Sequence, residues 1–131
     1  DIAPTILEAA QLAVPPDFEA RSLWPSLERR DDHQPRDAVY AELARDHIQT
    51  GSEFILMRRD RRWKIVVYLD DTYGELYDLE ADPDEVRNLW NEASLRAMRE
   101  ELQDRCMTWL ARGALTANRR PGRAPQRAMK I

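Results

Sequence analysis

One short segment, residues 63–69, constrains the fold more than any other part of the sequence. It reads Trp-Lys-Ile-Val-Val-Tyr-Leu, so β-branched and aromatic residues dominate and apolar side chains fall on both alternating faces. A strand of this kind is stable between other strands, with both of its faces covered. The segment therefore predicts a β-sheet in which residues 63–69 take a central position.

Three further segments are predicted to pair with this strand. A period of two marks residues 38–43 and residues 54–57, and residues 75–79 form a short last strand. The charged run 58–62 and the run 70–74 separate these strands and are predicted to be hairpin tips. The expected core structure is an antiparallel sheet of about four strands.

Helical signals flank the predicted sheet. Residues 4–10 are expected to form a short helix with Pro4 in its first turn. Asp82 and Pro83 are typical of a helix start, which predicts a short turn of helix to about Trp90. A longer helix is expected from residue 93 to 112, about 30 Å in length, with one apolar stripe lying on a face of the sheet. That stripe consists of Leu95, Met98, Leu102, Cys106, Trp109 and Leu110.

The predicted fold class is therefore α+β, and we divide the chain into three parts. Residues 1–30 are a short helix and a linker, and residues 31–112 are the sheet with its long helix. Residues 113–131 are expected to be a disordered tail, because Gly113 is predicted to stop the helix and little apolar material follows it.

Charge and composition exclude several classes of function. The net charge is −4, and the tail carries five basic residues and no acid, so the rest of the chain is at −9. The sequence argues against nucleic acid as a partner, because the tail lacks interleaved aromatic residues and follows an acidic body that repels phosphate. No apolar run is long enough to cross a bilayer. The single cysteine excludes an internal disulfide and is compatible with a reducing compartment; cytoplasmic and periplasmic locations both stay open.

Few side chains have the spacing that catalysis requires. His33 and His47 are the only histidines, and neither is spaced from a second ligand as in a metal site. Cys106 lies on the apolar stripe and is expected to be buried. The pair at 70–71 could suggest a metal site and the arginines around Asp60 an anion site, but both are interpreted as features of hairpin tips.

Several motifs occur in an order that points to one family. Residues 1–10, Asp-Ile-Ala-Pro-Thr-Ile-Leu-Glu-Ala-Ala, are similar to an Asp-x-x-Pro-Thr-Leu-Leu segment, and residues 20–23 are similar to Gly-Arg-Ser-Leu. Residues 39–42, 62–65 and 75–89 follow in the same order as in that family. Together they resemble the C-terminal third of type I sulfatases, in the alkaline-phosphatase-like superfamily. Two departures are Gln11 and Ala20, which stand where the family has glycine.

The resemblance implies that catalysis takes place outside this chain. Type I sulfatases hydrolyse sulfate esters with a formylglycine, made within Cys/Ser-x-Pro-x-Arg, beside a divalent metal of calcium type. Neither Cys106 nor Ser22 is followed by that pattern. No catalytic, cofactor-binding or metal-binding residue is therefore assigned here, and the chain alone is expected to be inactive.

The implied role is structural, with a contribution to the rim of the substrate cleft. Residues 1–30 would end the catalytic α/β domain, and residues 31–112 would form the small C-terminal subdomain. Candidate rim residues are Arg45, Asp46 and His47, in the loop expected after the first strand. The implied partner is an N-terminal catalytic domain of the same protein, and an isolated chain is expected to expose an apolar surface or to form a homodimer.

Two other interpretations stay open at this point. The chain could be a stand-alone protein-interaction module that uses the same apolar surface. It could also come from a hydrolase of phosphonate monoesters or phosphodiesters, because relatives of this architecture act on those substrates and a fold does not choose a substrate.

Overall fold

The computed structural model describes residues 1–16, 18, 20–29, 35–46, 52–69 and 71–118. These residues fall into two compact units, one ending at residue 35 and one beginning at residue 36. Within the described ranges, no helix combines the length and the apolar composition that crossing a bilayer requires. The predicted tail is described only as far as Asn118, and its remaining residues lie outside the described part.

The first unit contains the predicted N-terminal helix, α1, at Ile2–Ala9, and a second short helix, α2, at Trp24–Leu27. Hydrogen bonds tie the segment before α2 to α1: the amide of Leu23 donates to Thr5 Oγ1 over 2.8 Å. The α1 side chains Ile2 and Ile6 are 75% and 62% exposed. Among the described residues of this unit only Pro4 is buried, so the unit has no apolar core of its own.

Gln11 ends α1 in a left-handed conformation. Its φ is 57°, and the amide of Leu12 donates to the carbonyl of Leu7 over 2.8 Å, which closes the last turn of the helix. Glycine is favoured at such a position, since a side chain there costs about 1 kcal/mol or more. Gln11, which replaces the glycine of the family, therefore has a strained backbone conformation. Ala20, the other replacement, is not among the residues with positive φ.

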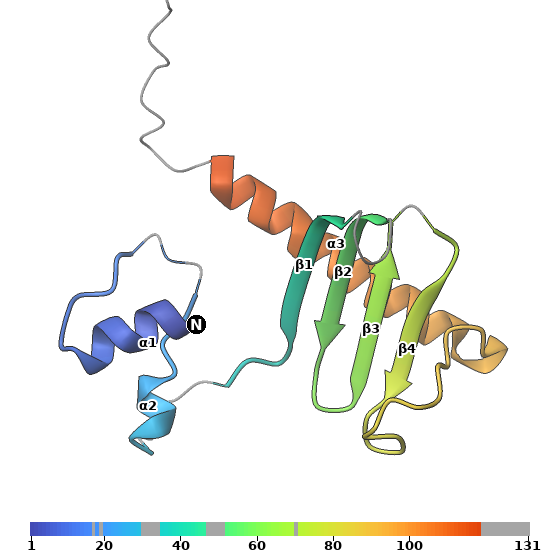
Figure 1. Ribbon diagram of the computed structural model, residues 1–131, viewed down its shortest axis with the longest axis horizontal. Coiled ribbons are helices and arrows are strands. Elements are labelled where there is room, and N and C mark those ends of the chain that lie inside the picture. Colours follow the sequence, from blue (N-terminus) through green and yellow to red (C-terminus); the bar gives the residue numbers. More distant parts are fainter. Residues whose placement is uncertain (17, 19, 30–34, 47–51, 70, 119–131) are drawn as a thin grey trace, which may run out of the picture. The chain divides into compact units, whose positions relative to one another are not determined.

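The second unit is built on a four-stranded antiparallel sheet in the order β1-β2-β3-β4 (Figure 1). All four strands were predicted from the sequence, and β3 lies between two neighbours as expected. Cross-strand partners include Leu56 with Val67 and Ile65 with Leu76. The strand bounds are Val39–Asp46 for β1, Ser52–Arg59 for β2, Trp63–Tyr68 for β3 and Gly74–Asp78 for β4.

A long helix covers one face of this sheet, and the fold is α+β as predicted. The helix α3 spans Arg96–Asn118 and follows a 3-10 turn at Ala93–Leu95. In Figure 1 it crosses behind the strands. Side chains of β2, β3, β4 and α3 meet in one core, whose buried members are Leu56, Ile65, Val67, Leu76, Trp90, Leu102 and Cys106.

The short helix expected from Asp82 to Trp90 is absent, and that prediction was wrong. The carboxylate of Asp82 does accept hydrogen bonds from the amides of Val86 and Arg87, over 3.1 and 2.8 Å. Glu85, however, has a φ of 56°, which no residue of a right-handed helix adopts. The capping contacts therefore form at a turn rather than at a helix start.

Gly113 does not stop the last helix, which continues to Asn118. A glycine inside a helix costs only about 1 kcal/mol relative to alanine. Residues 114–117, Ala-Leu-Thr-Ala, include good helix formers that offset this cost. The predicted end at residue 112 was therefore too early.

Trp90 connects the irregular segment after β4 to the sheet. The residue is 8% exposed, and its indole Nε1 donates to the carbonyl of Thr72 over 3.1 Å. A Cβ on Gly74 would lie 2.3–2.5 Å from this ring. Glycine at position 74 is thus required by the approach of the ring to the backbone of β4.

Substitution of each described glycine by alanine should change stability in opposite directions. Gly74→Ala forces the Trp90 ring out of place and should lower the free energy of unfolding by about 1–3 kcal/mol. Gly113→Ala meets no atom within 4 Å and should raise it by about 0.5–1 kcal/mol, because alanine favours the helix. Urea unfolding followed by tryptophan fluorescence measures both, and a neutral Gly74→Ala would contradict the contact.

Candidate functional site

The candidate rim residues lie where β1 leads toward β2. The backbone of Arg45 and Asp46 belongs to β1, and Asp46 pairs with Ser52 of β2. The side chains of Arg45 and Asp46, and all of His47, lie outside the described part of the structure. Their role at a substrate cleft therefore stays a prediction.

Cys106 is buried in the core, as expected from its place on the apolar stripe. It is fully inaccessible to solvent, and burial raises the pKa of its thiol to about 11. At neutral pH the thiol is therefore protonated and shielded, which is the opposite of what a nucleophilic cysteine requires. The residue contributes to packing between α3 and the sheet.

Arg58 is buried beside Cys106, although the sequence suggested a solvated hairpin tip. Only 3% of Arg58 is exposed, and its Nη1 donates to Asp60 Oδ2 over 2.7 Å. Its guanidinium lies 6.0 Å from the ring of Tyr40, which stacks on Trp109 of α3 at 4.8 Å. The signal for this burial was present in the sequence, since Arg58 alternates in phase with Phe54 and Leu56.

Arg58 and Asp60 form an ion pair in which each group stabilises the charged form of the other. Burial opposes ionisation of both groups, but the hydrogen bond to Asp60 raises the pKa of Arg58 above its ordinary value. For Asp60, the amide of Trp63 and the Arg58 guanidinium outweigh burial and hold the pKa of the carboxyl below its ordinary value. Arg58 Nε has no hydrogen-bond partner within the described residues. The pair is a structural element that holds the β2–β3 hairpin, not an anion site.

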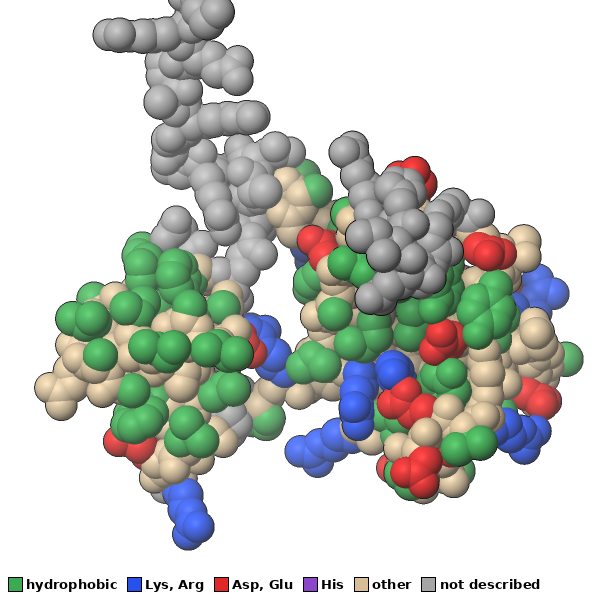
Figure 2. Space-filling view, viewed as in Figure 1, with side chains coloured by type: hydrophobic (Ala, Val, Ile, Leu, Met, Phe, Trp, Pro, Cys, Tyr) green, Lys and Arg blue, Asp and Glu red, His purple; other side chains and the backbone are tan. Residues whose placement is uncertain are grey.

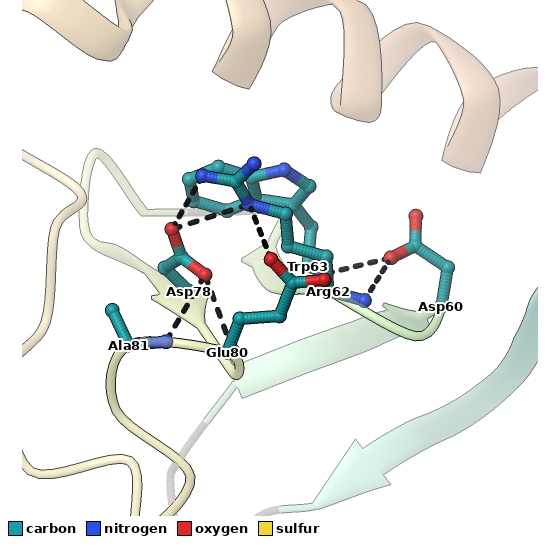
Figure 3. A network of polar contacts seen from close by, with 6 residues as sticks. All are labelled: Asp60, Arg62, Trp63, Asp78, Glu80 and Ala81. Atoms are coloured by element: carbon teal, nitrogen blue, oxygen red, sulfur yellow. Dashed lines mark hydrogen bonds and ion pairs between the residues drawn. The ribbon is translucent and has the colours of Figure 1, made fainter.

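A second polar network ties the same hairpin to the end of β4 (Figure 3). Asp60 Oδ1 accepts from the amides of Arg62 and Trp63 over 2.9 and 2.6 Å. Arg62 donates through Nη2 to Asp78 Oδ2 over 2.9 Å, and its guanidinium lies 5.0 Å from the ring of Trp63. Asp78 Oδ1 in turn accepts from the amide of Glu80 over 3.2 Å. Two of the four arginines around Asp60 are thus committed to internal carboxylates.

The remaining arginines of the hairpin line a shallow pocket of mixed charge. Arg59 and Arg61 lie there with Arg36, but Asp37 and Asp60 line the same pocket. The mixture of charges gives no strong preference for an anion. The interpretation of the tip as a structural feature is therefore the better supported one.

The Asp70-Asp71 pair also functions in a turn, so far as it is described. Asp71 Oδ1 accepts from the amide of Tyr73 over 3.0 Å, and Asp70 lies outside the described residues. Across the described ranges, no group of three or more His, Cys, Asp or Glu side chains could hold a metal ion. These residues therefore do not fit the divalent metal that the sulfatase resemblance implies.

The face of the sheet opposite α3 carries a row of apolar side chains on β1, β2 and β3. We call its members the open-face patch: Val39, Ala41, Leu43, Ile55, Met57 and Val66. The strand register places Ala41, Met57 and Val66 in one row across three strands. Figure 2 views this side of the sheet and shows hydrophobic side chains over the strands.

The β3–β4 half of the same face is polar and internally paired. Tyr68 and Tyr77 donate to the two oxygens of Glu75 over 2.8 and 3.1 Å. Burial together with the nearby Glu75 charge raises the pKa of each phenol to about 12, so both stay protonated. Lys64 forms an ion pair with Glu85 beside them. This half of the face therefore satisfies its own polar groups.

Comparison with known proteins identifies the chain. Residues 1–111 match the family described as N-sulphoglucosamine sulphohydrolase, C-terminal. The chain belongs to this family. It is thus a C-terminal portion of a sulfatase of the alkaline-phosphatase-like superfamily, as the motif order predicted.

Relatives of this sulphohydrolase C-terminal portion are much longer than the chain itself. Arylsulfatase K of Gallus gallus is 34% identical over 94 residues, which is 68% of this chain and 18% of that protein. A solved structure of a 2-O GAG sulfatase superposes with a TM-score of 0.72 at 27% identity, over 86% of this chain and 24% of the other. The phosphonate monoester hydrolase of Agrobacterium radiobacter superposes with a TM-score of 0.67, also at 27% identity and with the same coverage of both chains.

Acid should weaken the protein through the lowered pKa of Asp60. A carboxyl with a lowered folded pKa contributes stability above its unfolded pKa, about 3.9, and that stability is lost as the pH falls through the folded value. The free energy of unfolding of the natural sequence should therefore fall between about pH 5 and pH 2, and that of Asp60→Asn should fall less.

Urea titrations at several pH values measure this difference. Asp104→Asn, at an exposed position of α3, is the matched control and should keep the profile of the natural sequence. Identical pH profiles for Asp60→Asn and the natural sequence would show that the Arg58–Asp60 pair contributes no linked stability.

Proposed function

We propose that this chain is the C-terminal subdomain of an enzyme whose full-length form hydrolyses sulfate esters. The observation that carries the proposal is the match of residues 1–111 to the sulphohydrolase C-terminal family. Support comes from relatives named as sulfatases, of which the chain covers 18–24%. In this proposal the catalytic domain precedes residue 1 in the same polypeptide.

The part played by this chain is structural. The covered sheet and α3 form a scaffold held by the core and by the Arg58–Asp60 pair. In this proposal the connection between β1 and β2 contributes to the rim of the substrate cleft, with Arg45, Asp46 and His47 as the candidate contacts. Rim residues of this kind act on substrate orientation and affinity, and bond cleavage takes place elsewhere.

A formylglycine and a divalent metal would belong to the catalytic domain. Neither the sequence pattern for formylglycine nor a described group of metal ligands lies in this chain. In the catalytic domain the formylglycine would supply the nucleophile, and the metal would supply positive charge at the sulfate. We derive no step of the reaction from the residues in hand, and we expect the isolated chain to be inactive.

A second candidate reaction is hydrolysis of phosphonate monoesters. The specific observation in its favour is the superposition on a phosphonate monoester hydrolase, at the same identity and coverage as on the 2-O GAG sulfatase. The residues that choose between sulfur and phosphorus esters would lie in the catalytic domain. A stand-alone interaction module is the remaining alternative, and it requires that no catalytic domain precede residue 1.

The first experiment is an aryl sulfatase assay on the full-length protein and on the 131-residue chain. The full-length protein is expressed with the formylglycine-generating enzyme and supplied with a divalent metal. Hydrolysis should occur with the full-length protein alone. Activity in the 131-residue chain would contradict the structural role, and activity only on an aryl phosphonate would favour the second candidate.

Rim residues should affect substrate binding more than turnover. In the full-length enzyme, Arg45→Ala or His47→Ala should raise KM several-fold for a bulky sulfate ester, with a smaller effect on kcat and no change of Tm. Loss of an interaction made equally in the ground and transition states has this kinetic signature. Arg61→Ala, at the exposed hairpin tip, is the control, and equal effects at positions 45 and 61 would count against a rim role.

A further inference from the structure

The open-face patch breaks the pattern expected of a sheet with one solvated face. Such sheets place apolar side chains toward the core and polar side chains toward water. In β1 the order is reversed: Val39, Ala41 and Leu43 point away from α3, while the alternate positions on the helix side include Tyr40 and Glu42. Val39 and Leu43 are 48% and 49% exposed. The strand is therefore patterned for a second layer that the described residues do not contain.

The patch has a definite limit across the sheet. Along β2 it ends at Glu53 and Arg59, which share the face of Ile55 and Met57, and across the sheet it ends at β3, where the paired groups of the polar half begin. Met57 and Ile55 are half-buried, and Val66 is 8% exposed. An apolar area surrounded by polar groups is typical of the centre of a permanent interface rather than of a surface that faces water.

The first unit gives an independent sign of missing packing. Ile6 of α1 and Leu27 of α2 are 62% and 67% exposed, and this unit has only one buried residue in its described part. Within the described residues, apolar side chains on both units therefore lack a cover. The longer relatives indicate where such a cover would come from. The chain spans only 18–24% of the length of arylsulfatase K and the 2-O GAG sulfatase, so the cover would belong to the rest of the protein.

We propose that the open-face patch is the surface on which the upstream catalytic domain of the same polypeptide packs. This inference rests on the proposed function and adds to it the face, the strands and the residues of the contact. A domain tethered to residue 1 is present at a high effective concentration, so it occupies this apolar patch ahead of a second copy. The patch then becomes part of an interdomain core, and the β1–β2 connection is held close to the other domain.

The test is site-specific photo-crosslinking in the full-length protein. Leu43→p-benzoylphenylalanine places the probe in the patch, and mass spectrometry of the digested product identifies the peptide that it captures. The expected result is an intramolecular cross-link to a segment upstream of residue 1. The same probe at Val86, which is 83% exposed and outside the patch, is the control and should give no such product.

Each other outcome overturns the proposal. A cross-link between two copies would make the patch a homodimer surface, and a cross-link confined to residues 36–118 would make it an internal contact of the second unit. Absence of any cross-link would leave the patch facing solvent. These results do not depend on the substrate, so a protein that forms the expected cross-link but hydrolyses no sulfate ester would refute the proposed function alone.

A charge substitution gives a second measurement. Leu43→Glu should lower the Tm of the full-length protein by several degrees, because it buries an unpaired carboxylate between the domains. Val86→Glu, at a position that is already exposed, should leave the Tm unchanged. Equal Tm values for the two variants would contradict burial of the patch.

Discussion

Packing of β3 against α3 is the interaction on which the second unit depends. Ile65 and Val67 of β3 share one core with Leu102 and Cys106 of α3. Burial of apolar side chains is worth about 1.5–3 kcal/mol for each large residue, and no other layer covers this face. Without α3 the strands would present apolar side chains on both faces, and a lone sheet of this kind is not stable in water.

The same packing explains why a charged residue is tolerated inside the unit. Arg58 lies on the covered face of β2, where an unpaired guanidinium would be costly. Asp60 neutralises its charge, and the Tyr40 ring lies against it while stacking on Trp109. Removal of one partner from such a pair costs more than the pair itself contributes. The hairpin between β2 and β3 is consequently held in one orientation relative to α3.

Because the chain belongs to the sulphohydrolase C-terminal family, the uncovered face of the sheet can be interpreted as a contact with another domain. An isolated domain with one exposed sheet face normally makes that face polar, as the β3–β4 half does here through Glu75 and Lys64. The β1–β2 half carries the apolar side chains of the open-face patch, flanked on β2 by Glu53 and Arg59. The division between the two halves separates the area that faces water from the area that we assign to an interdomain contact.

The sequence by itself determined the four strands, the long helix and the burial of Cys106, because these follow from local alternation of apolar side chains. Tertiary structure alone decided the path of residues 82–90. Asn88 Oδ1 accepts from the amide of Leu76 over 3.1 Å, and the amide of Leu89 donates to the Leu76 carbonyl over 2.8 Å, so this segment runs along the edge of β4. Those long-range bonds, and the Trp90 ring over Gly74, outweigh the local preference for a helix.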